Sequence, residues 1–127
     1  MALVSSRMVE VCIFSIEQHI ARYLLLRRSK QERVYPDLWQ FVTGSIEGAE
    51  QASEAALREL EEETGLQPIA FWVVPYVNSF YDPGWDSLNL MPVFAAEVQE
   101  GTKPRLSDEH YESGWFSFEE AMAMLVW

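Results

Sequence analysis

The chain of 127 residues has the usual length of one domain, and its 49% hydrophobic and 23% charged residues are typical of a globular protein. Its net charge of −11 argues against nonspecific binding to a nucleic-acid polymer, because phosphates repel an acidic surface. The single cysteine, Cys12, excludes an intrachain disulfide, and no apolar stretch approaches the roughly 20 residues that a membrane span needs. We therefore expect one cytoplasmic domain over residues 1–127 that binds neither a nucleic-acid polymer nor a membrane.

The first part of the chain predicts three strands and a loop. The run "VEVCIFSI" (9–16) is rich in β-branched residues, which favours a strand buried on both faces, with Cys12 as a small core residue. The runs "RYLLLRR" (22–28) and "WQFVTG" (39–44) predict two shorter strands. The polar, proline-containing segment 29–38 predicts the loop between them.

The middle of the chain predicts a helix and two longer strands. Residues 51–64 form the clearest helix, because Ala, Leu and Glu are good helix formers and Gly65 is favoured just beyond a helix C-terminus. The runs over 69–81 and 87–98 predict strands, and the turn residues "DPGWD" join them.

The last part predicts a loop over 101–110, a short strand within "YESGWFSF" and a second helix that Ser117 caps, with Glu120 at position N3. The order of strands, helix, strands and helix indicates an α+β fold, with an α/β/α sandwich around a mixed β-sheet. Two readings of the end, "AMAMLVW", stay open: a last helix that docks fully, or a helix whose natural tail is missing.

A helical wheel at about 100° per residue divides the glutamates of the predicted helix into two sets. Glu59 and Glu63 fall on the apolar face, which is expected to pack against the sheet. Glu62 lies at the edge of that face, whereas Glu54 and Glu61 lie on the opposite face and are expected to be solvated.

Two unpaired carboxylates on an inward face would repel each other and lose solvation, so their charge must be offset. A bound Mg²⁺ or Mn²⁺ would offset it, because hard cations prefer carboxylate oxygens. Alternatively, Glu59 and Glu63 form ion pairs with arginines such as Arg27 or Arg28. The wheel alone leaves both readings open.

Residues 44–66, "GSIEGAEQASEAALRELEEETGL", resemble the Nudix box, G-x5-E-x7-R-E-U-x-E-E-x-G-U, in which U is aliphatic. Every fixed position matches: Gly44, Glu50, Arg58, Glu59, Leu60, Glu62, Glu63, Gly65 and Leu66. The predicted order of strands and helices agrees with the Nudix α/β/α sandwich. The flanks, "PDLWQFVTGSIEGAE" and "SDEHYESGWFSFEEA", look like those of bacterial dATP and dihydroneopterin triphosphate pyrophosphatases of this family.

The resemblance implies that Glu59, Glu62 and Glu63 bind a divalent cation, Mg²⁺ or Mn²⁺, and that the Gly44 carbonyl lies near it. It also implies catalytic roles for Glu62, as a ligand or base, and for Glu63. Arg58 is implied to act as an orienting ion-pair partner.

Glu109 matches the segment that delivers a further metal-binding glutamate in the similar pyrophosphatases, so it is implied as a ligand or general base. Its neighbours Asp108 and His110 could also take part, although a loop "SDEH" is more often plain polar surface.

The same resemblance suggests residues that contact substrate. Arg28 and Thr43 are candidate phosphate or substrate contacts, although Arg28 has an equally simple reading as a surface arginine. Aromatic residues that would stack on a base are Trp39, Phe80, Tyr81 and Trp85. Alternatively, each of these side chains packs in the hydrophobic core or at the rim of the site without contacting a base.

The resemblance implies a metal-dependent pyrophosphohydrolase that cleaves a nucleoside triphosphate, dATP-like or a pterin triphosphate, to the monophosphate and pyrophosphate. The alternative substrates are a dinucleoside polyphosphate, ADP-ribose or an oxidised nucleotide. The position of Tyr81 after the box favours a dinucleoside polyphosphate among these alternatives. A third reading, a non-catalytic nucleotide-binding regulator, is disfavoured by the intact box. Dimers are common in the family, so a homodimer is a further expectation.

Overall fold

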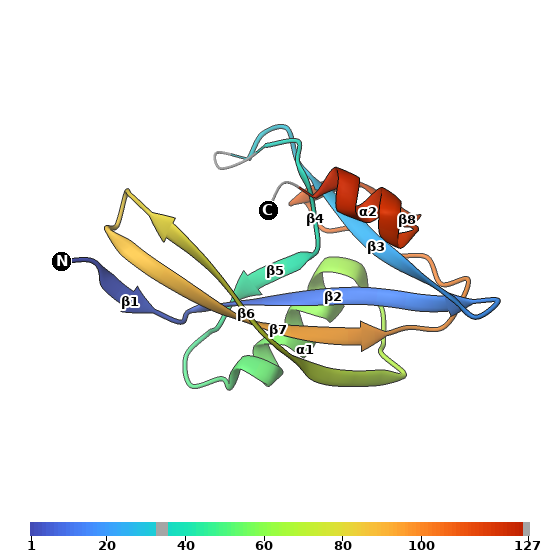
Figure 1. The fold of residues 1–127 in the computed structure, drawn as a ribbon, viewed down its shortest axis with the longest axis horizontal. Coiled ribbons are helices and arrows are strands. Elements are labelled where there is room, and N and C mark those ends of the chain that lie inside the picture. Colours follow the sequence, from blue (N-terminus) through green and yellow to red (C-terminus); the bar gives the residue numbers. More distant parts are fainter. Residues whose placement is uncertain (33–35, 126–127) are drawn as a thin grey trace.

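The computed structural model describes residues 1–32 and 36–125, so the loop expected over 29–38 lies partly outside the described residues. Within these residues, one eight-stranded mixed sheet packs against two helices (Figure 1). In chain order the elements are β1 (Leu3–Ser5), β2 (Met8–Glu17), β3 (Ile20–Arg28), β4 (Trp39–Gln40), β5 (Val42–Ser45), α1 (Ala52–Thr64), β6 (Ala70–Asp82), β7 (Ser87–Glu97), β8 (His110–Phe116) and α2 (Phe118–Met124). This confirms the predicted α+β fold with a mixed sheet.

Strand β7 gives the sheet its mixed character. It runs parallel to β1 and β2 and antiparallel to β6. Strands β3, β4, β5 and β8 add antiparallel pairs on the other side of β2. The long β6–β7 hairpin and β1 extend beyond the body of the molecule, where they form an arm (Figure 1).

The two faces of β2 differ in burial. Its fully buried residues, which alternate along the strand as the pleat requires, are Val9, Val11, Ile13 and Ser15. The other face, which carries Cys12, is only half-buried, so the expectation of a strand buried on both faces was wrong, and Cys12 is partly rather than fully buried. The reason is that α1 covers the first face, whereas the second face carries Glu10 and borders a cavity.

Strands β2 and β3 separate along their length. They pair from Ile13 to Glu17, but the N-terminal half of β2 pairs with β5 and the C-terminal part of β3 pairs with β4. The single strand predicted over 39–44 is therefore two strands, because the chain changes partners at Phe41. Figure 1 shows β2 and the end of β3 pointing away from each other.

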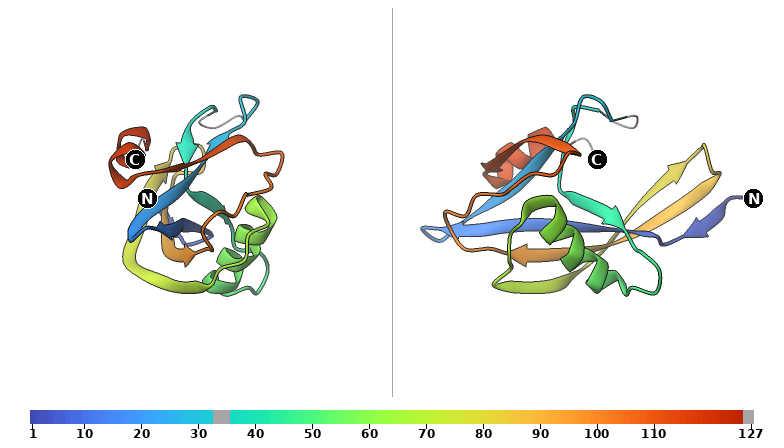
Figure 2. Two further views of the ribbon diagram at one scale, coloured as in Figure 1. Left: turned by 90° about the vertical axis from the view of Figure 1, so that its right-hand side faces the viewer. Right: turned by 180° about the vertical axis from the view of Figure 1, so that it is seen from behind.

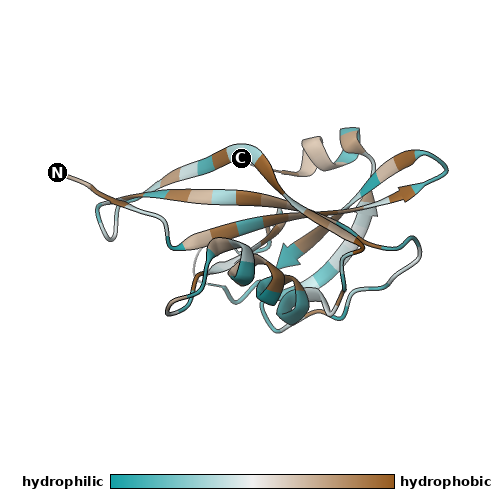
Figure 3. Ribbon diagram, turned by 90° about the horizontal axis from the view of Figure 1, so that it is seen from below, coloured by the Kyte–Doolittle hydropathy of each residue, from teal (hydrophilic) through white to brown (hydrophobic). Residues whose placement is uncertain are grey.

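Helix α1 begins and ends as its sequence predicts. Gln51 and Glu54 form a reciprocal capping box at the N-terminus, and Gly65 has a φ of 69°, the left-handed conformation that favours glycine. The small residues Ala55 and Ala56 are fully buried against the sheet, which brings the helix close to it. Apolar and hydrophilic positions alternate along α1 in Figure 3, as expected for a half-buried helix.

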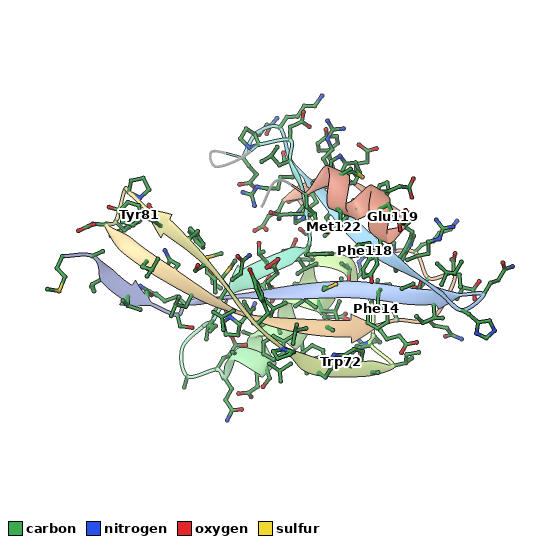
Figure 4. The ribbon with its side chains drawn as sticks, viewed as in Figure 1. Phe14, Trp72, Tyr81, Phe118, Glu119 and Met122 are labelled. Atoms are coloured by element: carbon green, nitrogen blue, oxygen red, sulfur yellow. The ribbon has the colours of Figure 1, made fainter. Side chains whose placement is uncertain are left out.

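Helix α2 contacts β3 and β8, and the side views place α1 and α2 on opposite sides of the sheet (Figure 2). The predicted capping box of Ser117 and Glu120 is confirmed. On the same side as α2, Phe14 packs edge-on against Trp72, with ring centroids 5.7 Å apart (Figure 4). None of the described helices is long and apolar enough to cross a membrane.

Candidate active site

The glutamates of α1 face the directions that the helical wheel predicts. Glu59 and Glu63 are 8% and 5% exposed, so their side chains lie on the face that packs against the sheet. Glu54, Glu61 and Glu62 are exposed. Two acidic side chains therefore lie buried one helical turn apart.

A close approach between Gly44 and Glu59 holds α1 against β5. A Cβ atom added to Gly44 would lie 2.0 Å from Cδ of Glu59, so a residue with a side chain does not fit there without a shift. Glycine at this position lets the Glu59 carboxylate lie directly against the backbone of β5.

Arg58 connects the glutamates around it. Its Nε donates to Glu50 (2.8 Å), and its Nη1 donates to Glu59 and Glu62 (3.0 Å each). Its Nη2 donates to the carbonyl of Ser45 at 2.7 Å, which ties α1 to the end of β5. The hydrogen bond from Arg58 lowers the pKa of Glu50.

Arg58, rather than Arg27 or Arg28, is thus the arginine that offsets the charge of Glu59. Arg27 and Arg28 form ion pairs with other acids, Glu112 and Glu32 respectively. Burial nevertheless raises the pKa of Glu59, because the bonds from Arg58 offset it only partly and neighbouring carboxylates add repulsion.

Glu63 has a different set of partners. Its Oε2 lies 3.1 Å from Nδ1 of His110 and accepts a hydrogen bond from the Ser107 hydroxyl at 2.6 Å. The Gln40 amide nitrogen lies 3.0 Å from Nε2 of His110 and donates to it, so the imidazole carries its proton on Nδ1 and donates to Glu63. Burial pushes the pKa of Glu63 up, but the bonds from His110 and Ser107 outweigh it, and the net pKa is lowered.

Glu109 joins this group from the loop before β8. The ligand atoms of Glu63, Glu109 and His110 lie within 4.8 Å of one another. Partial burial and then the negative charge of Glu63 raise the pKa of Glu109. Both ring nitrogens of His110 are engaged by Gln40 and Glu63, so His110 acts as a partner of Glu63 and the carboxylates are the available ligands.

The burial of His110 was not predicted by the sequence. The "SDEH" run indicated polar surface, but His110 is only 4% exposed. It lies inside because β8 begins with it and pairs it with Arg28 of β3, a contact between segments far apart in the chain. No local pattern marks such a pairing.

A cavity of about 360 Å³ lies beside the acidic group, where β2 and β3 diverge. Arg28 and Thr43, both predicted to contact substrate, line it. Gln40 also lines it and is hydrogen-bonded to His110, so one side chain connects the cavity with Glu63. Arg28 lowers the pKa of Glu63 and is therefore near enough to act on that charge.

Other residues of the cavity differ from those predicted. Phe80 lines it, but Trp39 and Tyr81 do not. Trp39 packs edge-on against Phe116, with centroids 5.4 Å apart, and Tyr81 donates to Asp86 at 2.7 Å near the tip of the β6–β7 arm (Figure 4). The structure brings polar residues to the cavity that the sequence did not single out: Glu10, Gln40, Asn78, Ser79 and Asp82.

The donor groups fit a hard divalent cation. Buried and half-exposed carboxylates from α1 and from the loop before β8 supply oxygen ligands, which Mg²⁺ and Mn²⁺ prefer over nitrogen and sulfur. Glu63 and Glu109, whose ligand atoms lie within 4.8 Å of each other, could hold such an ion. The resemblance implies Glu59, Glu62 and the carbonyl of Gly44 as further ligands. A cation would also relieve the raised pKa of Glu59 and Glu109.

Residues 6–127 match the family model described as the NUDIX domain. The chain is 32% identical to an octanoyltransferase of Myxococcus xanthus over 126 residues, which cover 94% of this chain but 33% of that protein. It is 33% identical to a dihydroneopterin triphosphate diphosphatase of Haemophilus influenzae, covering 81% of this chain and 70% of the relative.

Among solved structures, the dihydroneopterin triphosphate pyrophosphohydrolase of E. coli has the same fold. It superposes with a TM-score of 0.77 at 24% identity, covering 100% of this chain and 90% of that one. The chain spans about a third of the length of the octanoyltransferase, so the likeness to that protein concerns one part of it. Together, the family match over residues 6–127 and the complete glutamate-rich motif on α1 establish that this chain belongs to the Nudix family.

Proposed function

We propose that this chain is a metal-dependent pyrophosphohydrolase that cleaves a nucleoside triphosphate, dATP-like or a pterin triphosphate, to the monophosphate and pyrophosphate. The observation that carries the proposal is the link between the buried carboxylates of α1 and an adjacent cavity through Gln40 and His110. The 33% identity to the dihydroneopterin triphosphate diphosphatase of Haemophilus influenzae supports the substrate class.

In this proposal Glu59, Glu62 and Glu63 would hold Mg²⁺ or Mn²⁺, and Glu109 would be a further ligand or the general base. A cation held there would supply neutralisation of phosphate charge and a bound water of lowered pKa. Arg58 does not touch substrate; it fixes the Glu59 and Glu62 carboxylates by hydrogen bonds of 3.0 Å to each.

The protein's own groups have distinct tasks in the reaction. Glu109 lies in the acidic group with Glu63 and His110, so as the general base it would accept a proton from the attacking water. Arg28 and Thr43, which line the cavity, bind phosphate oxygens. The rest of the cavity receives the heterocycle.

A dinucleoside polyphosphate is the less favoured substrate. Its support from the sequence was Tyr81, and this side chain is bonded to Asp86 on the arm and does not line the cavity. The cavity of about 360 Å³ is of a size to hold one heterocycle and its sugar.

The experiment that tests the proposal measures pyrophosphate release with Mg²⁺ across dATP, dGTP, 7,8-dihydroneopterin triphosphate, diadenosine tetraphosphate and ADP-ribose. We expect monophosphate and pyrophosphate from at least one triphosphate, and no turnover after exhaustive chelation. Hydrolysis restricted to the last two compounds would move the chain to another substrate class. Full turnover after chelation would remove the cation from the mechanism, and no hydrolysis at all would favour a nucleotide-binding regulator.

A further inference from the structure

Glu10 is a carboxylate that the proposed hydrolysis does not use. It lies on β2, on the face away from α1, and it lines the cavity. The Asn78 amide nitrogen donates to its Oε2 at 3.1 Å. Burial raises the pKa of Glu10, and the bond from Asn78 offsets that effect only in part.

A half-buried carboxylate is costly where its surroundings are apolar. The cavity that Glu10 lines has apolar wall residues in Met8, Phe41, Phe80 and Met91. A carboxylate can accept about four hydrogen bonds, and within the described part of the chain Asn78 is its hydrogen-bond donor. Glu10, which lines the cavity, therefore keeps acceptor capacity for a ligand that enters it.

Asn78 is itself held in place. Its side-chain oxygen accepts from the backbone N–H of Ser79 at 3.0 Å, which fixes the amide so that its nitrogen faces Glu10. The register of β6 on β7 opposes Asn78 to Met91, a buried residue of the same cavity. The acid and the amide thus form a hydrogen-bonded pair in the cavity wall, carried by strands β2 and β6 of the sheet.

We propose that Glu10 and Asn78 are the specificity-determining pair of this cavity, and that they select a heterocycle with a 2-amino-4-oxopyrimidine edge. Guanine and the pterins share this edge, which presents a ring N–H and an exocyclic amino group side by side. An ionised carboxylate accepts from both donors at once.

The same pair disfavours adenine. Its corresponding edge presents one donor, the 6-amino group, beside an acceptor, the unprotonated N1, whose lone pair would face an oxygen of Glu10. A site built to accept two hydrogen bonds rejects a ligand that supplies one, because an acceptor is then left unpaired in the cavity. This inference rests on the proposed function and chooses between its two substrates, favouring the pterin over the dATP-like triphosphate.

The rest of the cavity is consistent with this orientation. Phe41 and Phe80 offer aromatic surfaces for a flat ring. Arg28 and Gln40, which connect with the acidic group, line the same cavity from β3 and β4. A ligand whose ring contacts Glu10 can therefore direct its phosphates toward Arg28.

The test compares Glu10→Gln with wild type and with Glu17→Gln as a matched control. Glu17 lies on the same strand but outside the cavity, where it pairs with Arg22. A glutamine amide offers one donor and one acceptor, which complement adenine. Two readouts are used: kcat/KM for dGTP, dITP, dATP and 7,8-dihydroneopterin triphosphate, and calorimetric binding of GMP, AMP and neopterin without divalent cation, which does not depend on hydrolysis.

In wild type we expect a preference of at least roughly tenfold for the guanine and pterin ligands over adenine, with dITP, which lacks the 2-amino group, in between. Glu10→Gln should abolish or invert the preference, and Glu17→Gln should keep it. Asn78→Ala, which releases the Glu10 carboxylate, should weaken the preference. This variant also serves as the second test if Glu10→Gln fails to fold.

The outcomes separate this inference from the proposed function. Hydrolysis of triphosphates without a preference, or with one that Glu10→Gln and Asn78→Ala leave unchanged, overturns the specificity pair and leaves the hydrolase intact. A binding preference for guanine and pterin ligands, together with no hydrolysis of any triphosphate, overturns the proposed hydrolase and leaves the specificity pair intact. If neither a preference nor hydrolysis is found, both proposals are overturned.

Discussion

His110 and Glu63 form a buried hydrogen bond between β8 and α1, with Nδ1 of the imidazole 3.1 Å from Oε2 of the carboxylate. The other ring nitrogen accepts from Gln40, which lines the cavity between β2 and β3. The relationship joins three segments far apart in the chain and fixes the direction in which the free oxygen of Glu63 points. It is the kind of supporting contact that orients a metal ligand.

Replacing His110 with phenylalanine keeps a ring of similar shape but removes both hydrogen bonds. We expect the free energy of unfolding to fall by about 1–3 kcal/mol, because Gln40 and Glu63 lose their buried partner. We also expect the Mg²⁺ concentration for half-maximal activity to rise roughly tenfold or more, since Glu63 is no longer oriented. Urea unfolding and Mg²⁺ titration measure the two effects. His19→Asn, in an exposed turn, should change neither, and an unchanged Mg²⁺ requirement in His110→Phe would confine His110 to a structural role.

Glu63→Gln and Glu61→Gln test the two faces of α1. Glu63 is buried beside His110, whereas Glu61 is exposed and accepts a hydrogen bond from Gln67. We expect the first substitution to lower kcat by roughly two orders of magnitude or more and the second to have little effect. Steady-state pyrophosphate release measures both. Equal losses would show that the buried face of α1 is not the catalytic one.

Gly44→Ala tests the contact between β5 and Glu59. The new Cβ would lie 2.0 Å from Cδ of Glu59, so that side chain or the strand must move. We expect the free energy of unfolding to fall by about 1–3 kcal/mol and the Mg²⁺ concentration for half-maximal activity to rise. The control is Gly84→Ala, whose Cβ would approach the Asp82 side chain at 3.3 Å. It should change the free energy of unfolding and the Mg²⁺ dependence only slightly. A fully active Gly44→Ala variant would argue against Glu59 as a ligand.

Glu109→Ala removes the carboxylate that reaches the acidic group from outside α1. Because it lies in a loop, we expect the free energy of unfolding to stay within about 1 kcal/mol of wild type. We expect hydrolysis to slow by roughly two orders of magnitude, a usual size for a general base. Asp108→Ala should slow it much less. If Asp108→Ala is inactive and Glu109→Ala is not, the role belongs to Asp108; normal turnover in both would remove the loop from the mechanism.

Cys12 should be unreactive in the folded protein. Burial, with the nearby charge of Glu10, raises the pKa of its thiol from 9.0 to about 12. Because the thiolate is the reactive form, labelling by a disulfide reagent at pH 8 should be about a thousandfold slower in the folded than in the unfolded chain. The folded state also holds the thiol proton more tightly, so stability from this group is present below pH 9 and falls as the pH rises toward 12. Rapid labelling without denaturant would show that Cys12 is open to solvent.

Several elements could be predicted because their signals are local. The period of the apolar residues and Gly65 define α1, and the turn residues between β6 and β7 define the hairpin. The helical period also places Glu59 and Glu63 inside and Glu61 outside, as observed. These predictions need only the geometry of one segment.

The errors arose where the environment of a segment depends on distant partners. The chain changes strand partners at Phe41 because β4 pairs with β3 and β5 pairs with β2. The second face of β2 is half-exposed because little of the chain packs against it. Trp39 and Tyr81 are aromatic and near the motif in the chain, but their packing against Phe116 and bonding to Asp86 keep them from lining the cavity.

The sequence by itself determined the family, the helix that carries the glutamates and the face on which they lie, because a fixed spacing on one helix defines its own geometry. Only the tertiary structure decided what surrounds those glutamates. His110 reaches Glu63 through the pairing of β8 with β3, and Glu10 meets Asn78 across the sheet. Such contacts depend on strand register between distant segments, and register is set by the packing of the whole sheet.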